Sequence, residues 1–196
     1  ASEKYRQRHV LEDGAPLLRN LAAIGIAPEE IKLVILTHLH TDHAGGATYR
    51  DDASRLHPTF PRARHVVQRC EWEDAVNQLP ELVGAYYPND FAPLEDSGLV
   101  DVVDGDVEVA PGISVQLTGG HTRGHQIVRF ESGNDSSVCL ADLVPTTHHL
   151  PSLWSMSYDQ FPLEVRRKKP LVLGDIVENR RLALFSHDPS IAAGRI

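Results

Sequence analysis

Three histidines and one aspartate lie within a single short segment of this sequence. The segment reads His38-Leu39-His40-Thr41-Asp42-His43, and it follows an almost wholly apolar run, residues 31–37. A crowded turn rarely offers every imidazole its own hydrogen-bond partner, whereas a divalent ion such as zinc takes neutral imidazoles and a carboxylate as ligands. The residue types in this segment therefore predict a metal site.

The spacing within the segment suits more than one ion. His38 and His40 are separated by one residue, so on an extended backbone their side chains leave on the same side and can bind one ion. Asp42 and His43 would face a neighbouring ion as the chain turns into a helix. Gly45 and Gly46 allow the backbone to approach a metal pair, although an ordinary loop explains these glycines equally well.

The elements that must carry these residues follow from the pattern of apolar positions. The β-branched run 31–37 predicts a buried strand covered on both faces, with His38 at its carboxyl end. Helical spacing of leucines predicts a helix over 14–25, and a second short helix is expected over 71–78. Further strands are predicted at 64–68, 99–103, 107–109, 113–117, 127–130, 138–141 and 182–185.

Two regions in the second half of the chain stand out from this pattern. Asp142 is expected to end the strand at 138–141, which places a carboxylate at a strand terminus. The interval 159–180 is the hardest to assign, because Pro170 and Gly174 would interrupt a long helix.

Composition limits the classes of function. With 196 residues and 41% apolar content the chain can form one sizeable core, so a single domain spanning residues 1–196 is expected. A formal charge of −8 disfavours nucleic acid as a partner, and the dense basic run at 166–169 is most simply a solvated face. Without a membrane-spanning or targeting segment, a soluble cytoplasmic protein is expected, with Cys70 and Cys139 as free thiols.

The motifs together resemble a known family. His-x-His-x-Asp-His after an apolar strand resembles the signature of the metallo-β-lactamase superfamily. Gly120-His121-Thr122-Arg123-Gly124-His125 is similar to that superfamily's Gly-His-Thr-Pro-Gly-His, with Arg123 where proline is usual. Leu140-Ala141-Asp142 resembles the aspartate that bridges two ions, and Ser186-His187-Asp188 resembles the final histidine motif. The resemblance spans most of the chain.

The resemblance implies a fold. It is an α+β fold, the four-layer αββα metallo-β-lactamase sandwich. Members of the superfamily begin with several strands before the helix that leads to the metal loop, and only 37 residues precede His38. We therefore expect this chain to lack its first N-terminal strands, which would expose a sheet edge and invite self-association as a homo-oligomer.

The resemblance also implies seven metal ligands. One zinc would be bound by His38, His40 and His121, and the second by Asp42, His43 and His187. Asp142 would bind both ions. Iron or manganese accepts the same nitrogen and oxygen ligands, so zinc is the favoured metal and not the only candidate. His125 is expected to form hydrogen bonds beside the ligands and not to bind metal.

The implied chemistry is hydrolysis. Two ions ~3.5–4 Å apart lower the pKa of a water between them to about 7 and polarise a carbonyl group. The resemblance thus implies a dinuclear-zinc hydrolase whose metal-bridging hydroxide attacks a small lactone or carboxylic ester, with Asp42 as the catalytic residue that orients the hydroxide and relays a proton. An apolar wall for this small-molecule carbonyl substrate is expected from Trp154, Met156, Tyr158 and Phe161, although core packing explains these residues as well. The roles of His148 and His149 stay open.

Several alternatives share these motifs. A glyoxalase II-like thioester hydrolase adds a helical C-terminal domain, and nine residues follow His187 here. The familiar zinc β-lactamases use a cysteine ligand, and flavodiiron redox proteins have a glutamate where His40 stands. A non-catalytic metal-binding protein would normally have lost a ligand. Lactone or ester hydrolysis is therefore placed first.

Overall fold

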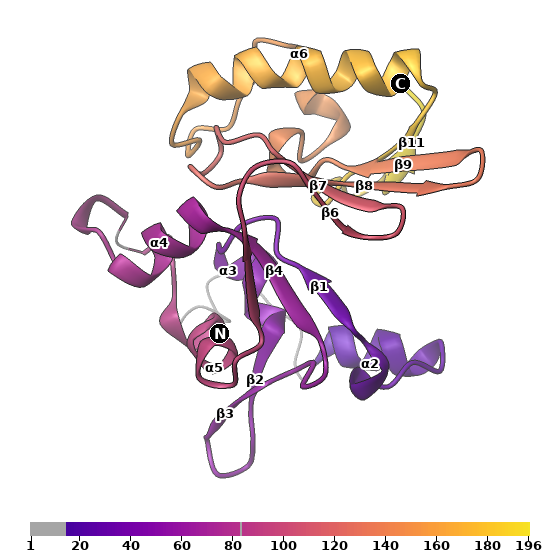
Figure 1. Cartoon of the computed structure of the whole chain (residues 1–196). Helices are drawn as coiled ribbons and strands as arrows, with labels where there is room; N and C mark the ends of the chain where they lie inside the picture. The colour runs from indigo at the N-terminus through magenta and orange to yellow at the C-terminus, as the bar shows by residue number, and fades with distance from the viewer. Residues whose placement is uncertain (1–14, 83) are drawn as a thin grey trace. The chain divides into compact units, whose positions relative to one another are not determined.

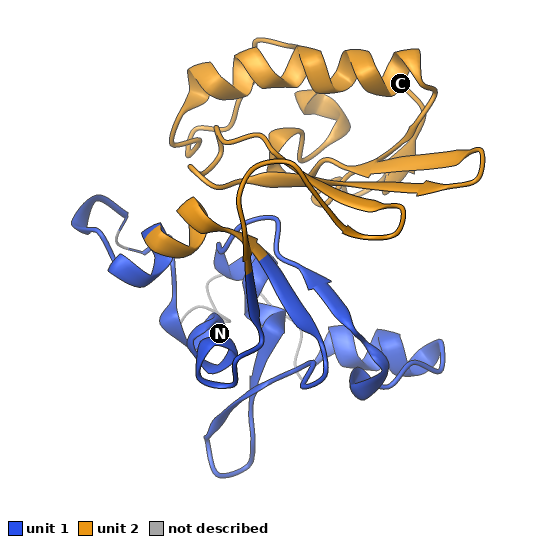
Figure 2. Ribbon diagram, viewed as in Figure 1, with its two compact units in different colours: residues 1–66, 74–101 blue, residues 67–73, 102–196 orange. Residues whose placement is uncertain are grey.

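The computed structural model describes residues 15–82 and 84–196, which divide into two compact units (Figure 2). Unit 1 takes the described residues up to 66 together with 74–101, and unit 2 takes 67–73 together with 102–196. Each unit combines strands with helices, as the labels of Figure 1 show, so the predicted α+β class is confirmed. No helix of the described residues is both long and apolar enough to cross a membrane.

Unit 1 is organised around a three-stranded sheet. Its order is β1-β4-β5, with β1 at Leu33–Ile35, β4 at Arg64–Gln68 and β5 at Val100–Val103, and β1 runs parallel to β4. The unit boundary falls within β4, β5 and the helix α4. The remaining elements are α2 (Pro16–Ala23), η1 (Pro28–Glu30), α3 (Thr41–Ala44), η2 (Gly45–Ala47), β2 (Thr48–Arg50), β3 (Leu56–Pro58), α4 (Arg69–Asn77), η3 (Pro80–Leu82), η4 (Pro88–Asp90) and α5 (Ala92–Asp96).

The strand that leads to the histidine segment differs from its prediction. β1 has three residues, and all three are only half-buried. The expectation of a strand buried on both faces is therefore wrong, and in the described part of the chain β1 also lies at the edge of the sheet. Burial begins where the strand ends: Leu36 is 4% exposed, and its N–H still donates to the carbonyl of Val66.

Unit 2 contains a six-stranded sheet in the order β11-β10-β9-β8-β7-β6. Strands β6 to β9 form an antiparallel meander, whereas β10 runs parallel to β9 and needs a crossover, which α6 (Pro162–Glu178) provides. The strands are β6 (Val107–Ala110), β7 (Ile113–Leu117), β8 (Gln126–Ser132), β9 (Asp135–Cys139), β10 (Leu182–Leu184) and β11 (Ala193–Gly194), and the short helices are η5 (Ala141–Leu143) and η6 (Thr147–His149).

Helix α6 lies along one face of this sheet (Figure 1). Val165, Val172 and Ile176 of α6 are buried in one cluster with sheet residues such as Ile127 and Val138. They recur at i, i+7 and i+11, which is one face of an α-helix. Burial of this stripe stabilises a helix that local propensity opposes.

The structure corrects the expectation that Pro170 and Gly174 interrupt a long helix. α6 has 17 residues and includes both. Pro170 is exposed, so water can reach the Arg166 carbonyl that loses its helical partner. The apolar contacts of the buried stripe outweigh the cost of the two poor helix formers.

Two turns of the unit 2 backbone bear on predictions made from the sequence. The hairpin predicted between β6 and β7 is present, and its Gly112 has φ +72°, with a Cβ at this position falling 2.3 Å from the Glu131 carbonyl oxygen. Asp142 does not end the preceding strand as expected: β9 stops at Cys139, and Asp142 lies in η5. The chain turns there through Ala141, whose φ is +44°, a conformation that residues with a Cβ rarely adopt.

Candidate metal centre

The first group of predicted ligands lies in unit 1, where the chain leaves β1. His38 is fully buried, and its Nδ1 lies 3.2 Å from the hydroxyl of Thr37. His40 has an extended backbone and is the N-cap of α3, whose first turn closes when the N–H of Ala44 donates to the His40 carbonyl at 2.8 Å. The expected turn from extended chain into helix is therefore present, as a helix of four residues.

This turn brings the predicted ligands of the segment together. The ring centroids of His38 and His40 are 4.7 Å apart, and those of His38 and His43 are 4.1 Å apart. Nε2 of His43 lies 3.6 Å from a carboxylate oxygen of Asp42. Three imidazoles and one carboxylate thus lie near one another in unit 1, and both donor types are ones that a divalent ion accepts.

Asp90, which the sequence analysis did not single out, braces this turn. Its carboxylate accepts a hydrogen bond from the hydroxyl of Thr41, the first residue of α3. Burial raises the pKa of Asp90, and the Thr41 hydrogen bond opposes that shift. Gly45 packs against the same carboxylate, with 3.7 Å between an added Cβ and Asp90 Oδ2. The contact joins residues 49 positions apart, so local spacing gave no signal for it.

The second group of predicted ligands lies in unit 2 and begins on the loop between β7 and β8. His121 is fully buried there. The preceding Gly120 has φ +89°, and a Cβ on it would lie 2.9 Å from the backbone nitrogen of Val165 at the start of α6. The glycine is therefore required by its φ and by the close approach of α6.

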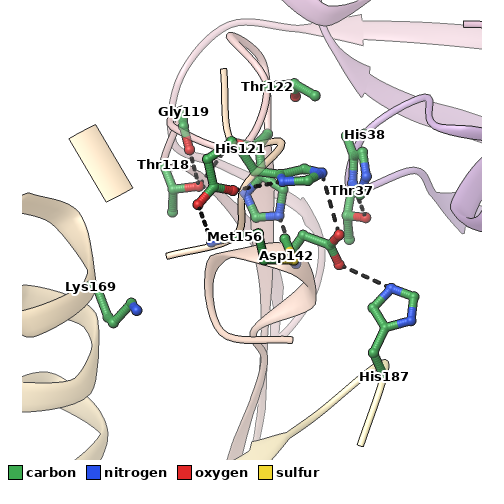
Figure 3. Close-up of polar contacts among 12 residues, drawn as sticks. Thr37, His38, Thr118, Gly119, His121, Thr122, Asp142, Met156, Lys169 and His187 are labelled. Atoms are coloured by element: carbon green, nitrogen blue, oxygen red, sulfur yellow. Dashed lines mark hydrogen bonds and ion pairs between the residues drawn. The ribbon is translucent and has the colours of Figure 1, made fainter. Parts of the chain in front are cut away.

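Asp142 connects the two other predicted ligands of unit 2. One of its oxygens lies 3.3 Å from Nε2 of His121, and the other lies 3.2 Å from Nε2 of His187 (Figure 3). His187 is positioned by its own N–H, which donates to the carbonyl of Pro145 at 3.0 Å. A carboxylate with one imidazole on each oxygen has the arrangement expected of a bridging ligand.

His125 takes part in hydrogen bonds at both ring nitrogens. Its Nε2 accepts from the backbone N–H of Asp142 at 3.1 Å, so Nδ1 carries the ring proton and faces the hydroxyl of Thr118 at 2.6 Å. The ring supports the position of Asp142. This arrangement agrees with the expected supporting role of His125.

The loop that carries His121 is braced by Glu71, another residue that the sequence analysis missed. The buried Glu71 carboxylate accepts from the hydroxyl of Thr122 at 2.6 Å and from the N–H of Gly124 at 3.2 Å. Arg123, where the superfamily usually has proline, donates to the carbonyl of Cys70 at 3.1 Å. The departure at this position therefore replaces a rigid residue with a contact to α4.

Asp159 is a further supporting residue beside the unit 2 ligands. Its Oδ1 lies 2.9 Å from Nδ1 of His121, and both side chains are buried. Carboxylates on the outer nitrogen of an imidazole are typical of histidines that bind metal. Its separation of 38 residues from His121 left no local pattern to detect.

The loop between η6 and α6 presents apolar side chains to solvent. Leu153, Trp154 and Tyr158 are 71%, 58% and 66% exposed, so core packing does not account for the aromatic residues of this loop. The Tyr158 ring lies 6.0 Å from the His121 ring. Lys169 anchors the loop, since its buried ammonium donates to the carbonyls of His149 and Trp154.

The predicted ligands of each unit are of donor types that a divalent metal ion accepts. The ligand types are neutral imidazole and carboxylate, and the outer nitrogens of His38 and His121 face a hydroxyl and a carboxylate. The predicted ligands divide four to unit 1 and three to unit 2. Among the described residues, His148 and His149 belong to none of the groups whose ligand atoms lie close enough to hold one ion, and His149 Nδ1 contacts the hydroxyl of Thr146 at 2.8 Å.

Comparisons with known proteins agree with these motifs. A family model described as the metallo-beta-lactamase superfamily matches residues 6–167. An N-acyl homoserine lactonase of Bacillus thuringiensis is 28% identical over 178 residues, which are 84% of this chain and 64% of that protein. The chain thus spans just under two thirds of that relative's length.

Solved structures also match. A probable metal-dependent hydrolase from Staphylococcus aureus superimposes with a TM-score of 0.90 at 30% identity, over 99% of this chain and 68% of that one. AidC, described as a dizinc quorum-quenching lactonase in complex with a product, gives a TM-score of 0.74 at 23% identity, over 91% of this chain and 65% of that one.

Proposed function

This chain belongs to the metallo-β-lactamase superfamily, and from that premise we propose that it is a metal-dependent hydrolase whose substrate is a small lactone. The fold expected of the superfamily is confirmed by the structural neighbour with a TM-score of 0.90. The pair of contacts that Asp142 makes, at 3.3 and 3.2 Å to two imidazoles, is the observation that carries the proposal.

The proposed metal site uses the seven predicted ligands. They are His38, His40, Asp42 and His43 of unit 1 and His121, Asp142 and His187 of unit 2. The order of the motifs along the chain supports assigning them to one pair of ions, and the description of AidC as a dizinc enzyme supports testing zinc first. Iron and manganese are the alternatives.

Two carboxylates of the chain, Asp142 and Asp42, would have different roles in the reaction. A pair of divalent ions, when bound, supplies a Lewis acid for the carbonyl and activates water near neutral pH. Asp142 has an imidazole at each oxygen and is suited to hold its partners in place. The Asp42 side chain is 51% exposed, which suits it to accept the proton of the attacking water and return it to the leaving oxygen.

Water and Asp42 account for the bonds and protons exchanged when a lactone ring opens. Water adds to the carbonyl carbon, the ring carbon–oxygen bond breaks, and the departing oxygen takes the proton that Asp42 relays. The products are a carboxylate and a hydroxyl on one molecule, and the second proton of the water is released to solvent. No second cofactor is required.

The exposed apolar loop supports an acyl substituent on the lactone. Leu153, Trp154 and Tyr158 offer apolar surface, and the contact of Tyr158 with His121 places part of that surface beside a proposed ligand. Because the relatives include proteins described as N-acyl homoserine lactonases, these lactones are proposed first and aryl or alkyl esters second.

The test measures metal content and turnover on one preparation. Elemental analysis of protein purified without chelators and supplied with zinc is expected to find two ions per chain. The ratio kcat/KM is then compared across N-acyl homoserine lactones, simple lactones, aryl esters, glutathione thioesters and β-lactams. A thioester or β-lactam that exceeds every lactone and ester by more than about tenfold, ~1.4 kcal/mol in transition-state stabilisation, would refute the substrate assignment.

A further inference from the structure

We propose that Asp159 is a positioning residue that fixes the ring tautomer of His121 and thereby makes its Nε2 available to a metal ion. The inference rests on the proposed function only in naming a metal as the partner of Nε2. The contact itself joins two buried side chains: Asp159 Oδ1 and His121 Nδ1 are 2.9 Å apart, and the side chains are 1% and 0% exposed.

The Asp159 carboxylate is itself held from the other side. Its Oδ2 accepts a hydrogen bond from the backbone N–H of Met156 at 2.8 Å. The segment is also bonded to the His121 loop through its backbone, because Gln160 donates to the His121 carbonyl at 3.0 Å and Phe161 donates to the Gly120 carbonyl at 2.8 Å. One oxygen of Asp159 therefore faces Met156 while the other faces the imidazole.

This arrangement determines where the ring proton lies. A carboxylate accepts hydrogen bonds, so the imidazole nitrogen that faces Asp159 must carry a proton. In the neutral ring, Nε2 of His121 then has a lone pair, and it points at an oxygen of Asp142 3.3 Å away. Two acceptors that face each other need a proton or a metal ion between them, and a divalent ion would accept both as ligands.

A comparison within the same loop supports the assignment. His125 also carries its ring proton on Nδ1, but that nitrogen faces the hydroxyl of Thr118, and its Nε2 accepts from a backbone N–H. Of these two rings, only His121 has a carboxylate at one nitrogen and a carboxylate at the other. The partners of each ring thus separate the proposed ligand from the supporting histidine.

The decisive variants are Asp159→Asn and Asp159→Ala. An asparagine has one acceptor and one donor end. If its oxygen accepts from Met156, its NH₂ group faces His121 Nδ1 and requires the opposite tautomer, with the proton on Nε2. If instead the asparagine oxygen faces His121, the asparagine NH₂ group faces the N–H of Met156, and two donors oppose each other. Asp159→Ala removes the acceptor altogether and leaves the tautomer to other contacts.

The primary readout is the tautomer of His121 in zinc-free protein, from the ¹⁵N chemical shifts of its ring nitrogens. Wild-type protein is expected to show the proton on Nδ1, and both variants are expected to lose that preference. The second readout is zinc affinity by chelator competition, which is expected to fall about 10–100-fold in each variant. Glu71→Gln is the matched control, because the hydrogen bonds that Glu71 accepts from Thr122 and Gly124 hold the same loop, and neither of them involves the His121 ring.

The outcomes separate this inference from the proposed function. If both Asp159 variants keep the Nδ1 proton and bind zinc within about twofold of wild type, the positioning role is refuted. If Glu71→Gln changes the tautomer as much as Asp159→Asn does, the effect is loosening of the loop and the role is again refuted. Wild-type protein that shows the expected tautomer but binds no zinc would refute the proposed function while leaving the control of the tautomer by Asp159 standing.

Discussion

At the scale of single residues, Asp142 is the group whose loss should be most damaging. It is 4% exposed and contacts His121 and His187 through different oxygens. Replacement by alanine would remove both contacts and one proposed metal ligand. We predict that Asp142→Ala lowers kcat/KM for a lactone by at least about 10²-fold, because supporting residues alone cost 10–100-fold in metal sites.

The measurement for Asp142→Ala is steady-state hydrolysis with metal content determined on the same sample. Asp175→Asn serves as its control, since Asp175 pairs with Arg129 and Arg181 in unit 2 and contacts none of the proposed ligands. Equal losses in the two variants would show that Asp142 acts through general stability and not through the reaction.

Residue types and spacing identified the candidate ligands but not what holds them. The clustering of His38, His40 and His43 was predictable, because residues close in sequence must lie close in space. Asp90, Asp159 and Glu71 were not predictable from spacing, because each supports its loop across 38 to 53 residues of sequence. A lone carboxylate has many roles, and only the fold shows which one it has.

At the scale of elements, α6 shows where sequence patterns mislead. Most strands matched their predicted positions, since alternating and β-branched runs report burial directly. The helix did not, because Pro170 and Gly174 signal interruption locally while Val165, Val172 and Ile176 stabilise the helix through tertiary contacts. The end of β9 was also mispredicted: the strand stops at Cys139, three residues before Asp142. The turn that follows it passes through Ala141, and no glycine marks this turn in the sequence.

Pro170 therefore offers a test of helix energetics. Proline in a helix interior is about 3 kcal/mol less favourable than alanine, and proline recovers up to ~1 kcal/mol by restricting the unfolded chain. We predict that Pro170→Ala raises the free energy of unfolding by about 2 kcal/mol, measured by urea denaturation. Leu171→Ala, which truncates the exposed neighbouring residue, is expected to change it by less than about 0.5 kcal/mol. A destabilised Pro170→Ala would show that α6 depends on the proline.

Lys169 gives this helix a dependence on pH. Burial lowers the pKa of its ammonium group below the ordinary value. Between that lowered pKa and about 10.4, the unfolded chain carries the proton on this lysine and the folded chain does not. The lysine therefore adds to stability as pH rises through that window, and the contribution is fully present above about 10.4.

We predict that the free energy of unfolding of wild type minus that of Lys169→Met rises with pH across this window. Subtracting the variant removes the titration of the other groups, and the measurement is urea denaturation at several alkaline pH values. Lys168→Met is the control, because Lys168 is exposed and is expected to give a difference that stays flat. A flat difference for Lys169→Met as well would contradict the lowered pKa.

At the scale of the whole molecule, the division of the ligands between two compact units has a thermodynamic consequence. Four proposed ligands belong to unit 1 and three to unit 2. An ion that takes ligands from both units binds only when both are folded, so its binding free energy stabilises them jointly. At a free zinc concentration 100 times the dissociation constant this contribution is about 2.7 kcal/mol for each independent ion.

Zinc should therefore change how cooperatively the chain unfolds, as well as its Tm. We predict that calorimetry with zinc shows one transition whose calorimetric and van't Hoff enthalpies agree, because neither unit can unfold without releasing the ions. With a chelator the transition is expected at lower temperature, with a van't Hoff enthalpy below the calorimetric one, since the ions no longer link the units. His187→Ala, which removes a ligand from unit 2 alone, should reproduce the chelator result in the presence of zinc. If zinc raises Tm while the two enthalpies keep the same ratio with and without chelator, the units unfold together whether or not the ions are bound, and the predicted effect of zinc on cooperativity is wrong.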